Sequence, residues 1–180
     1  MSKKLNIALI IPAFNEAENL PLLFPRFKQV VASLEEIGYN AKMVVINDGS
    51  SDDTASISKQ NGADIVSHPF NLGVCAALHS GFLYGVRNDV DILITVDADG
   101  QHNPEDIIYL INEFSNGDEN VLIGSRFIKD TGYKKEFFRF AGIKAFSLLV
   151  KAVTKLEIHD VTSGFRVFDK DVIKFLAKNF

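Results

Sequence analysis

The sequence predicts an α/β protein with a mostly parallel sheet and helices on both of its faces. Three observations support this. Apolar, β-branched runs of strand length alternate with amphipathic segments of helix length along the first two thirds of the 180 residues. Polar clusters follow three of the apolar runs. A composition of 47% hydrophobic and 23% charged residues is typical of a globular domain with a substantial core.

Five short apolar runs are expected to be strands. They are rich in Val and Ile and lack the polar alternation of a half-exposed strand, which is typical of strands buried on both faces. Strands that alternate with helices pair in parallel, because each helix carries the chain back to the starting edge. The predicted strands are residues 5–11, 43–46, 63–66, 92–96 and 121–123.

Four segments between these runs are expected to be helices. Residues 18–37 carry Pro21 and Pro25, which should delay or interrupt the helix. The start of the next helix has Ser and Asp residues suited to capping. The last helix begins with a proline and two acids, as helix starts prefer. The three later helices are expected at residues 51–60, 72–87 and 104–114.

The chain is expected to form one domain over residues 1–180, with no internal repeat. Cys75 is the single cysteine, so an internal disulfide is impossible, and its small neighbours predict a buried packing role. No signal peptide and no run of about 20 apolar residues is visible. Residues 172–176 form a basic and apolar pattern close to the last residue, so we expect a C-terminally truncated domain.

Charge is distributed unevenly along the chain. The net charge of −4 combines −10 over residues 1–125, +6 over residues 126–155 and a balanced remainder. Within the basic block, residues 133–155 interleave phenylalanines and aliphatic residues with Lys and Arg. This pattern predicts a basic amphipathic helical segment at a membrane interface. A helix packed on the sheet is the alternative.

The polar clusters are expected to meet at one edge of the sheet. They are residues 12–16, 47–50 and 97–99, and each follows a predicted strand. In parallel sheets, ligands bind outside the carboxyl ends of the strands. Three clusters at that edge therefore predict a binding site.

Asp97 and Asp99 are the strongest candidates for a metal site. Two carboxylates this close repel each other unless a cation lies between them. Oxygen ligands of this kind suit Mg²⁺ or Mn²⁺, and Gln101 would add a neutral oxygen. Ala98 and Gly100 leave the approach open. The alternative is an acidic turn without a metal, because Asp and Gly are common in turns.

The motifs together resemble those of the inverting nucleotide-sugar glycosyltransferases of family 2, which have the GT-A (Rossmann-like) fold. The resemblance covers nearly the whole chain and follows the order of the family's motifs. Within the family, the chain is most similar to polyprenyl-phosphate sugar transferases such as dolichyl-phosphate mannose synthase, a likeness carried by residues 160–166 (DVTSGFR). The other matching motifs are residues 11–16 (IPAFNE), 45–54 (VINDGSSDDT), 71–73 (NLG), 97–102 (DADGQH) and 124–127 (GSRF).

The resemblance implies a role for each matching residue. In the donor site, Asp48 would accept hydrogen bonds from the base, and Gly73 would let the backbone approach the nucleotide. Asp97 and Asp99, with Gln101, would hold the metal and the donor diphosphate beside Ala98. The remaining residues of the nucleotide pocket would be Pro12, Ala13, Asn15 and Glu16.

Other residues would serve the transfer step. Arg126, Arg139 and Arg166 would bind phosphates of donor and acceptor. Asp160 would act as a base if the acceptor were a sugar hydroxyl. Taken singly, these residues could also be surface charges or turn formers. The roles of His102 and His159 stay open.

The implied function is inverting, metal-dependent transfer of a sugar from a nucleoside diphosphate to an acceptor. The expected acceptor is a polyprenyl phosphate at the cytoplasmic face of a membrane. One alternative acceptor is a saccharide hydroxyl in cell-surface polysaccharide synthesis, and a non-enzymatic alternative is a sugar-nucleotide-binding scaffold. Residues 11–16 lack the glycine-rich loop of P-loop proteins, of dinucleotide-binding oxidoreductases and of nucleotidyltransferases. No nucleic-acid-binding motif is recognisable.

Overall fold

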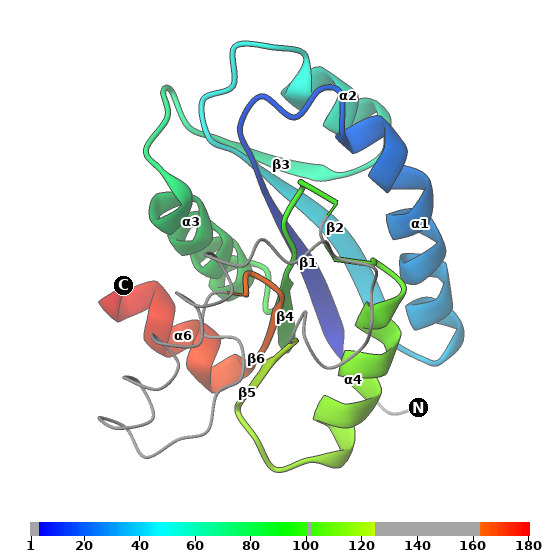
Figure 1. Ribbon diagram of the computed structural model, residues 1–180. Coiled ribbons are helices and arrows are strands. Elements are labelled where there is room, and N and C mark those ends of the chain that lie inside the picture. The colour runs from blue at the N-terminus through cyan, green and yellow to red at the C-terminus, as the bar shows by residue number, and fades with distance from the viewer. Residues whose placement is uncertain (1–3, 101, 125–162) are drawn as a thin grey trace, which may run out of the picture.

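A six-stranded sheet forms the centre of the computed structural model, which describes residues 4–100, 102–124 and 163–180. The strands lie in the order β3-β2-β1-β4-β6-β5 (Figure 1). The mostly parallel α/β fold predicted from the sequence is confirmed. The strands are β1 (Asn6–Ala13), β2 (Asn40–Asn47), β3 (Asp64–Ser67), β4 (Ile92–Thr95), β5 (Val121–Ile123) and β6 (Arg166–Asp169).

The strand β1 lies inside the sheet, and its pairing fixes the register of β2 and β4, its two neighbours. It pairs in parallel with β2 along its full length, from Asn6 opposite Asn40 to Ala13 opposite Asn47. On its other side it pairs in parallel with β4, and β3 continues the parallel set beyond β2. The carboxyl ends of β1, β2 and β4 therefore meet at one edge of the sheet.

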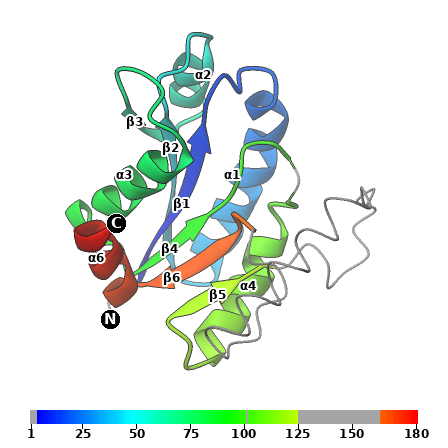
Figure 2. The ribbon, with the colours of Figure 1, turned by 60° about the vertical axis from the view of Figure 1, so that its left-hand side comes forward.

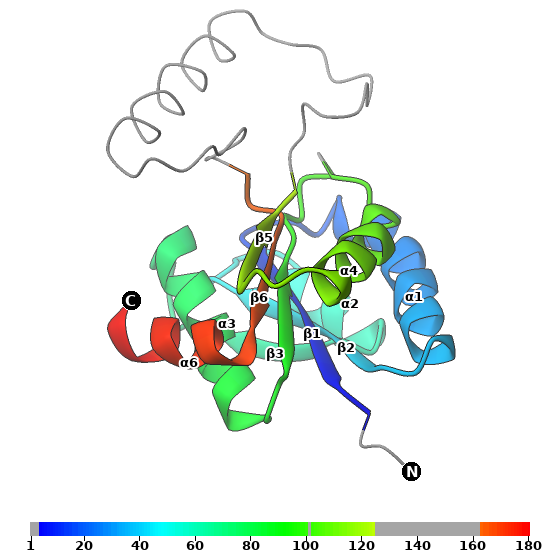
Figure 3. The ribbon, with the colours of Figure 1, turned by 90° about the horizontal axis from the view of Figure 1, so that it is seen from below.

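Helices cover both faces of the sheet (Figures 1 and 2). The helices α1 and α4 pack on one face, over a core built around Phe24, Phe27 and Ile107, all fully buried. The opposite face is covered by α3 and α6, which also contact each other (Figure 3). The bounds are α1 (Leu20–Glu36), α2 (Thr54–Gln60), α3 (Val74–Arg87), α4 (Asp106–Asn116) and α6 (Lys170–Asn179).

The prolines of α1 neither interrupt nor delay the helix beyond its first turn. Pro21 occupies the start, where no intrahelical donor is needed. Pro25 lies inside the helix and leaves the Pro21 carbonyl without its usual helical partner. The buried face, which includes Leu20, Phe24 and Phe27, outweighs that single loss. Of the two predicted effects, the interruption is wrong and the delay amounts to two residues, since α1 begins at Leu20 rather than at residue 18.

The strand β6 and the helix α6 were not predicted from the sequence. β6 lies between β4 and β5 and runs antiparallel to both. α6 follows it directly, and the Asp169 side chain caps the helix by accepting a hydrogen bond from the Val172 amide at 2.8 Å. β6 has only two apolar residues, Val167 and Phe168, between the charged Arg166 and Asp169, so it lacks a continuous apolar run and depends on tertiary pairing.

Cys75 is exposed, which corrects the prediction that it is buried. α3 buries Ala77, Gly81, Phe82 and Gly85 toward the sheet. Cys75 precedes Ala77 by two residues, about 200° around the helix, and so lies on the outer face. The small residues beside it serve close helix–sheet packing, because a side chain on Gly81 would overlap Ile10.

The remaining predicted elements are confirmed with shifted ends. β4 stops at Thr95, and α4 begins at Asp106 rather than at Pro104. The predicted membrane-interfacial segment, residues 133–155, lies outside the described residues. In the part of the chain that is described, no helix combines the length and the apolar character that crossing a membrane requires.

We expect Ile94→Ala to lower the free energy of unfolding by about 2–5 kcal/mol. Ile94 is fully buried and lies opposite Leu9 of β1 and Val167 of β6. Leu22→Ala is the control, because Leu22 is 73% exposed, and should change stability by less than about 0.5 kcal/mol. Urea unfolding of both variants checks the prediction, and equal losses would contradict the central position of β4.

Candidate functional site

A pocket of about 260 Å³ opens at the carboxyl edge of the sheet. Its wall combines residues that follow β1, β2 and β4 with residues from the start of α3. This arrangement confirms that the three polar clusters converge at one edge. The lining residues are Pro12, Ala13, Phe14, Glu16, Asp48, Asn71, Gly73, Val74, Ala77, Asp97, Ala98 and Asp99.

Hydrogen bonds fasten the loop after β1 to the loop after β2. The Asn15 amide donates to the Ser50 hydroxyl at 3.0 Å, and the Asn15 side-chain oxygen accepts from the Ser51 amide at 2.9 Å. Asn15 has a positive φ of 55°, which asparagine tolerates better than most residues. Its side chain therefore holds the two loops together, and Asn15 does not line the pocket.

Thr54 and Asp52 extend this connection. The fully buried Thr54 accepts a hydrogen bond from the Glu16 amide at 2.8 Å and donates to Asp52 at 2.5 Å. Asp52 also accepts from the Ala17 amide and from the Thr54 amide, both at 3.0 Å. Burial raises the pKa of Asp52, but these hydrogen bonds outweigh it and hold the pKa below its ordinary value. The N-cap of α2 is Asp53, whose side chain makes no capping hydrogen bond, and Asp52, one residue earlier, accepts from the first amide of the helix instead.

Asp48 is 4% exposed and accepts three hydrogen bonds. The Leu72 amide donates to Oδ1 at 2.9 Å, and the Gly73 amide donates to Oδ2 at 2.8 Å. His68 Nδ1 lies 2.6 Å from Oδ1. Burial raises the pKa of Asp48, but the hydrogen bonds with His68 and with the two amides outweigh it, so the pKa lies below its ordinary value. The carboxylate fixes the loop between β3 and α3.

Two glycines let the backbone close around Asp48. Gly49 has a φ of 70°, and a Cβ there would overlap the backbone of Phe70 and Asn71. Gly73 has a φ of 89° and is the N-cap of α3. Since Gly73 lines the pocket, the amino end of α3, with its partial positive charge, borders the pocket.

Asp97 and Asp99 lie in the turn after β4 and both line the pocket. Asp97 is half-buried and Asp99 is exposed. Gly164 packs against the Asp97 carboxylate so closely that a Cβ there would overlap it. Thr95 holds Gly164 in place by donating a hydrogen bond to its carbonyl oxygen at 2.6 Å. The backbone before β6 therefore forms one side of the Asp97 environment.

These carboxylates suit a hard divalent cation. Among the described residues no three His, Cys, Asp or Glu side chains group closely enough to form a complete metal site. Mg²⁺ and Mn²⁺ commonly take one or two carboxylates and fill the remaining positions with water and substrate phosphates. Asp97 and Asp99 fit that incomplete donor set. Gln101, the third predicted ligand, lies outside the described residues.

The end of the Asp97–Asp99 turn is fixed from two sides. Arg26 of α1 donates to both oxygens of Glu105, at 2.8 and 2.5 Å, and to the Asn103 side chain at 3.2 Å. His102 is 8% exposed, and its ring centroid lies 4.9 Å from that of Phe165. His102 is therefore an interior residue and does not face solvent.

The structure brings eight of the predicted site residues together in the pocket wall. Arg166 begins β6 opposite Thr95, and its Nε donates to the Ser163 carbonyl at 2.8 Å, but it does not line the pocket. Arg126, Arg139, Asp160, Gln101 and His159 lie outside the described residues. The eight are Pro12, Ala13, Glu16, Asp48, Gly73, Asp97, Ala98 and Asp99.

Several residues with clear roles at the site were missed from the sequence. His68 and Thr54 act through hydrogen bonds to partners 20 and 38 residues away, so no local pattern marks them. Phe14 is 45% exposed in the pocket wall. For Phe14, the sequence signal was an aromatic residue inside the polar cluster of residues 12–16.

Residues 8–176 match the family model described as glycosyl transferase family 2. The chain belongs to glycosyl transferase family 2. The match includes every residue that lines the pocket. It also includes β6, which the strand prediction lacked.

Two relatives of this family 2 domain illustrate the similarity. The polyprenol monophosphomannose synthase of Mycolicibacterium smegmatis is 27% identical, over 92% of this chain and 62% of its own length. The UDP-N-acetylglucosamine–dolichyl-phosphate N-acetylglucosaminyltransferase of Methanococcus voltae is 31% identical, over 99% of this chain and 74% of its own length. The chain thus spans about two thirds of these relatives.

The fold is shared with a solved glucosyltransferase structure. The glucosyl-3-phosphoglycerate synthase of Mycobacterium tuberculosis, in complex with Mn²⁺, UDP and glucosyl-3-phosphoglycerate, superposes with a TM-score of 0.70 at 18% identity. The superposition covers 93% of this chain and 57% of the synthase. At this identity the likeness establishes the GT-A fold of the family 2 domain.

We expect Gly164→Ala to weaken Mn²⁺ binding, measured in the presence of a nucleoside diphosphate, by about tenfold or more. The added Cβ would displace the Asp97 carboxylate. Gly38→Ala is the control, because nothing lies within 4 Å of its Cβ position. Its positive φ costs stability, but Mn²⁺ affinity should not change. Calorimetry measures the Mn²⁺ affinity of both variants. Unchanged affinity in Gly164→Ala would contradict a role for the close approach of Gly164 to Asp97 in metal binding.

Asp48 should stabilise the fold in a pH-dependent way. Because its folded-state pKa is lowered, its contribution is complete above the unfolded-state value of about 3.9 and is lost as pH falls through the folded-state pKa. The stability difference between the wild type and Asp48→Asn should therefore shrink only below about pH 4. Urea unfolding between pH 3 and 7, with Asp118→Asn as an exposed control, tests this. A pH-independent difference would contradict it.

Proposed function

We propose that the chain is the catalytic domain of an inverting, metal-dependent glycosyltransferase. It transfers a sugar from a nucleoside diphosphate to a polyprenyl phosphate. The observation that carries the proposal is the single pocket wall shared by Asp48, Asp97, Asp99 and the amino end of α3. Family membership and the names of the relatives, which are polyprenyl- and dolichyl-phosphate sugar transferases, support it.

The nucleoside would occupy the side of the pocket formed by β1, β2 and α3. Among the described residues, the Gly73 amide is the one donor to Oδ2 of the Asp48 carboxylate, so this oxygen has capacity for a donor N–H of a base. Phe14 offers an aromatic surface for stacking beside it. The amino end of α3 favours the negatively charged diphosphate.

The diphosphate would bind at Asp97 and Asp99 together with Mg²⁺ or Mn²⁺. The synthase with the same fold contains Mn²⁺ and UDP, which supports this assignment. A bound divalent cation supplies Lewis-acid stabilisation of the negative charge that develops on the departing diphosphate. Gly164 and Thr95 keep the Asp97 carboxylate in one position, so little reorganisation is needed during the reaction.

A polyprenyl phosphate acceptor simplifies the chemistry required of the protein. Its phosphate oxygen is already anionic at neutral pH and needs no general base, only cations that hold it in line with the sugar. Arg166 lies at the carboxyl edge of the sheet, next to β4. We assign phosphate binding to Arg166, Arg126 and Arg139, and keep Asp160 as the base required if the acceptor were a hydroxyl. Attack opposite the leaving diphosphate inverts the anomeric centre.

A lipid acceptor places the reaction at a membrane surface. We propose the cytoplasmic face, where nucleotide sugars would be available, and residues 133–155 as the interfacial segment. The local charge of +6 over residues 126–155 supports attraction to anionic lipid.

Asp99→Ala should reduce metal-dependent transfer by at least about 100-fold, because it removes one of two carboxylates for the cation. The assay is nucleotide release from a panel of nucleotide sugars with Mn²⁺ or Mg²⁺ and a polyprenyl phosphate. Asp118→Ala, which removes an exposed carboxylate away from the pocket, should retain full activity.

Two outcomes would contradict the proposal. Transfer to soluble saccharides with none to the lipid phosphate would assign the acceptor to the hydroxyl class. Absence of binding for every donor would contradict both the transferase and the sugar-nucleotide-binding scaffold.

A further inference from the structure

A partly buried series of hydrogen bonds leads from the pocket to α3. It starts at Asp48, continues through His68 and ends at Ser80 of α3. His68 Nδ1 lies 2.6 Å from Asp48 Oδ1, and His68 Nε2 lies 2.8 Å from the Ser80 hydroxyl oxygen. The side chains of His68 and Asp48 are 9% and 5% exposed. Two elements, the end of β3 and the middle of α3, thus hold one carboxylate of the pocket wall.

His68 itself is fixed by the sheet. Its amide donates to the Asn47 carbonyl at 2.9 Å, which extends the pairing of β2 and β3 by one residue. Both ring nitrogens are engaged, so the ring has one orientation that satisfies both partners. In the neutral tautomer that fits an ionised Asp48, Nδ1–H donates to the carboxylate and Nε2 accepts from the Ser80 hydroxyl.

The order of the three groups matches that of a serine hydrolase, but their placement does not. Ser80 lies in the second turn of α3 and is absent from the wall of the pocket, whereas Asp48 lines it. A nucleophile needs access to a substrate, and here the carboxylate has that access instead. The three hydrogen-bonded side chains therefore position the Asp48 carboxylate, and Ser80 does not serve as a nucleophile.

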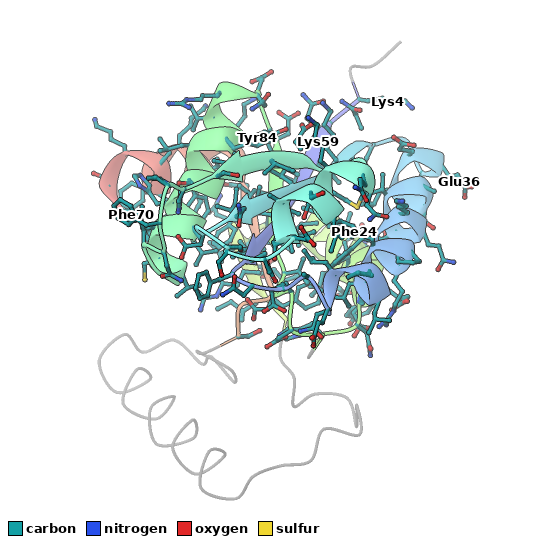
Figure 4. The ribbon with its side chains drawn as sticks, turned by 90° about the horizontal axis from the view of Figure 1, so that it is seen from above. Lys4, Phe24, Glu36, Lys59, Phe70 and Tyr84 are labelled. Carbon is teal, nitrogen blue, oxygen red and sulfur yellow. The ribbon has the colours of Figure 1, made fainter. Side chains whose placement is uncertain are left out.

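Asp48 in turn holds the loop before α3 in place. Its two oxygens accept from the Leu72 and Gly73 amides, and Gly49 lies against the backbone of Phe70 and Asn71. Phe70 is 62% exposed at the outer edge of the molecule, beside α3 (Figure 4), so this loop gains little from burial of its own apolar side chains. Hydrogen bonds to Asp48 are then its main restraint on the pocket side.

The geometry points to His68, supported by Ser80, as a positioning residue for the nucleoside side of the pocket. It holds the Asp48 carboxylate and the loop of residues 70–73 in the arrangement that receives the base. This inference rests on the proposed function, because it assigns the base to Asp48. It assigns His68 no direct contact with the diphosphate or the cation.

The first experiment compares nucleotide and diphosphate affinity. Dissociation constants for UDP, GDP and inorganic pyrophosphate are measured by calorimetry with Mn²⁺. His68→Leu, which removes both hydrogen bonds, should weaken the better-bound nucleotide by about 10- to 100-fold, the usual loss when a partner that orients a binding side chain is removed. Pyrophosphate affinity should fall less, because the cation at Asp97 and Asp99, which His68 does not contact, would still hold the diphosphate. Ser80→Ala should weaken the nucleotide less, and Ser80→Thr, which keeps the hydroxyl, should restore it.

His79→Leu is the matched control. His79 precedes Ser80 in α3 but points to the other side, where its Nε2 lies 3.1 Å from the Ala177 carbonyl oxygen of α6. The same substitution there should leave nucleotide affinity unchanged. Unchanged nucleotide affinity in His68→Leu, or an equal loss of pyrophosphate affinity, would overturn the inference.

A second experiment needs no nucleotide. Hydrogen exchange of the Leu72 and Gly73 amides should be faster in His68→Leu than in the wild type and in His79→Leu, because these amides lose a fixed acceptor. Equal exchange rates would overturn the inference. If the wild type bound no nucleotide but the exchange rates differed as expected, the positioning role would stand and the proposed function would fail.

Discussion

The parallel pairing of β1 with both β2 and β4 is the constraint on which the site depends. Each strand ends in a polar turn, and the fixed register of hydrogen bonds brings these turns to the same height at one edge of the sheet. Residues as far apart in the chain as Ala13, Asp48 and Asp97 therefore share one pocket wall. Without this register, the two carboxylates of the turn after β4 would not share a pocket with Asp48.

The elements predicted best from the sequence were those with a strong local pattern. Continuous apolar runs identified β1, β2 and β4, and the polar turns after them located the pocket. β6 was missed because Val167 and Phe168 are its only buried residues, and its position is set by pairing with β4 and β5. Tertiary pairing of so short a strand leaves almost no periodic signal.

In the site, too, residues marked by a local sequence pattern were predicted, and residues whose role depends on contacts distant in sequence were missed. Asp97 and Asp99 were recognisable because their chemistry is concentrated in three residues. Gly164 and His68 were not, since their importance lies in what they touch. Gly164 is needed for the close approach to Asp97, and His68 for its two bonds across the interior. Cys75 illustrates the opposite error, in which small neighbours suggested burial although the helix faces outward there.

The hydrogen bonds between Gly124 and the start of β6 have a consequence for how this domain can vary. The Ser163 hydroxyl donates to the Gly124 carbonyl at 2.6 Å, and the Gly124 amide donates to the Phe165 carbonyl at 2.8 Å. Gly124 and Ser163, the described residues on either side of the interval, are therefore adjacent in space. Doubling the length of such an interval costs only about 0.6 kcal/mol in loop-closure entropy. A change in the length of chain between these two points therefore costs little and need not disturb the pocket at the carboxyl edge of the sheet.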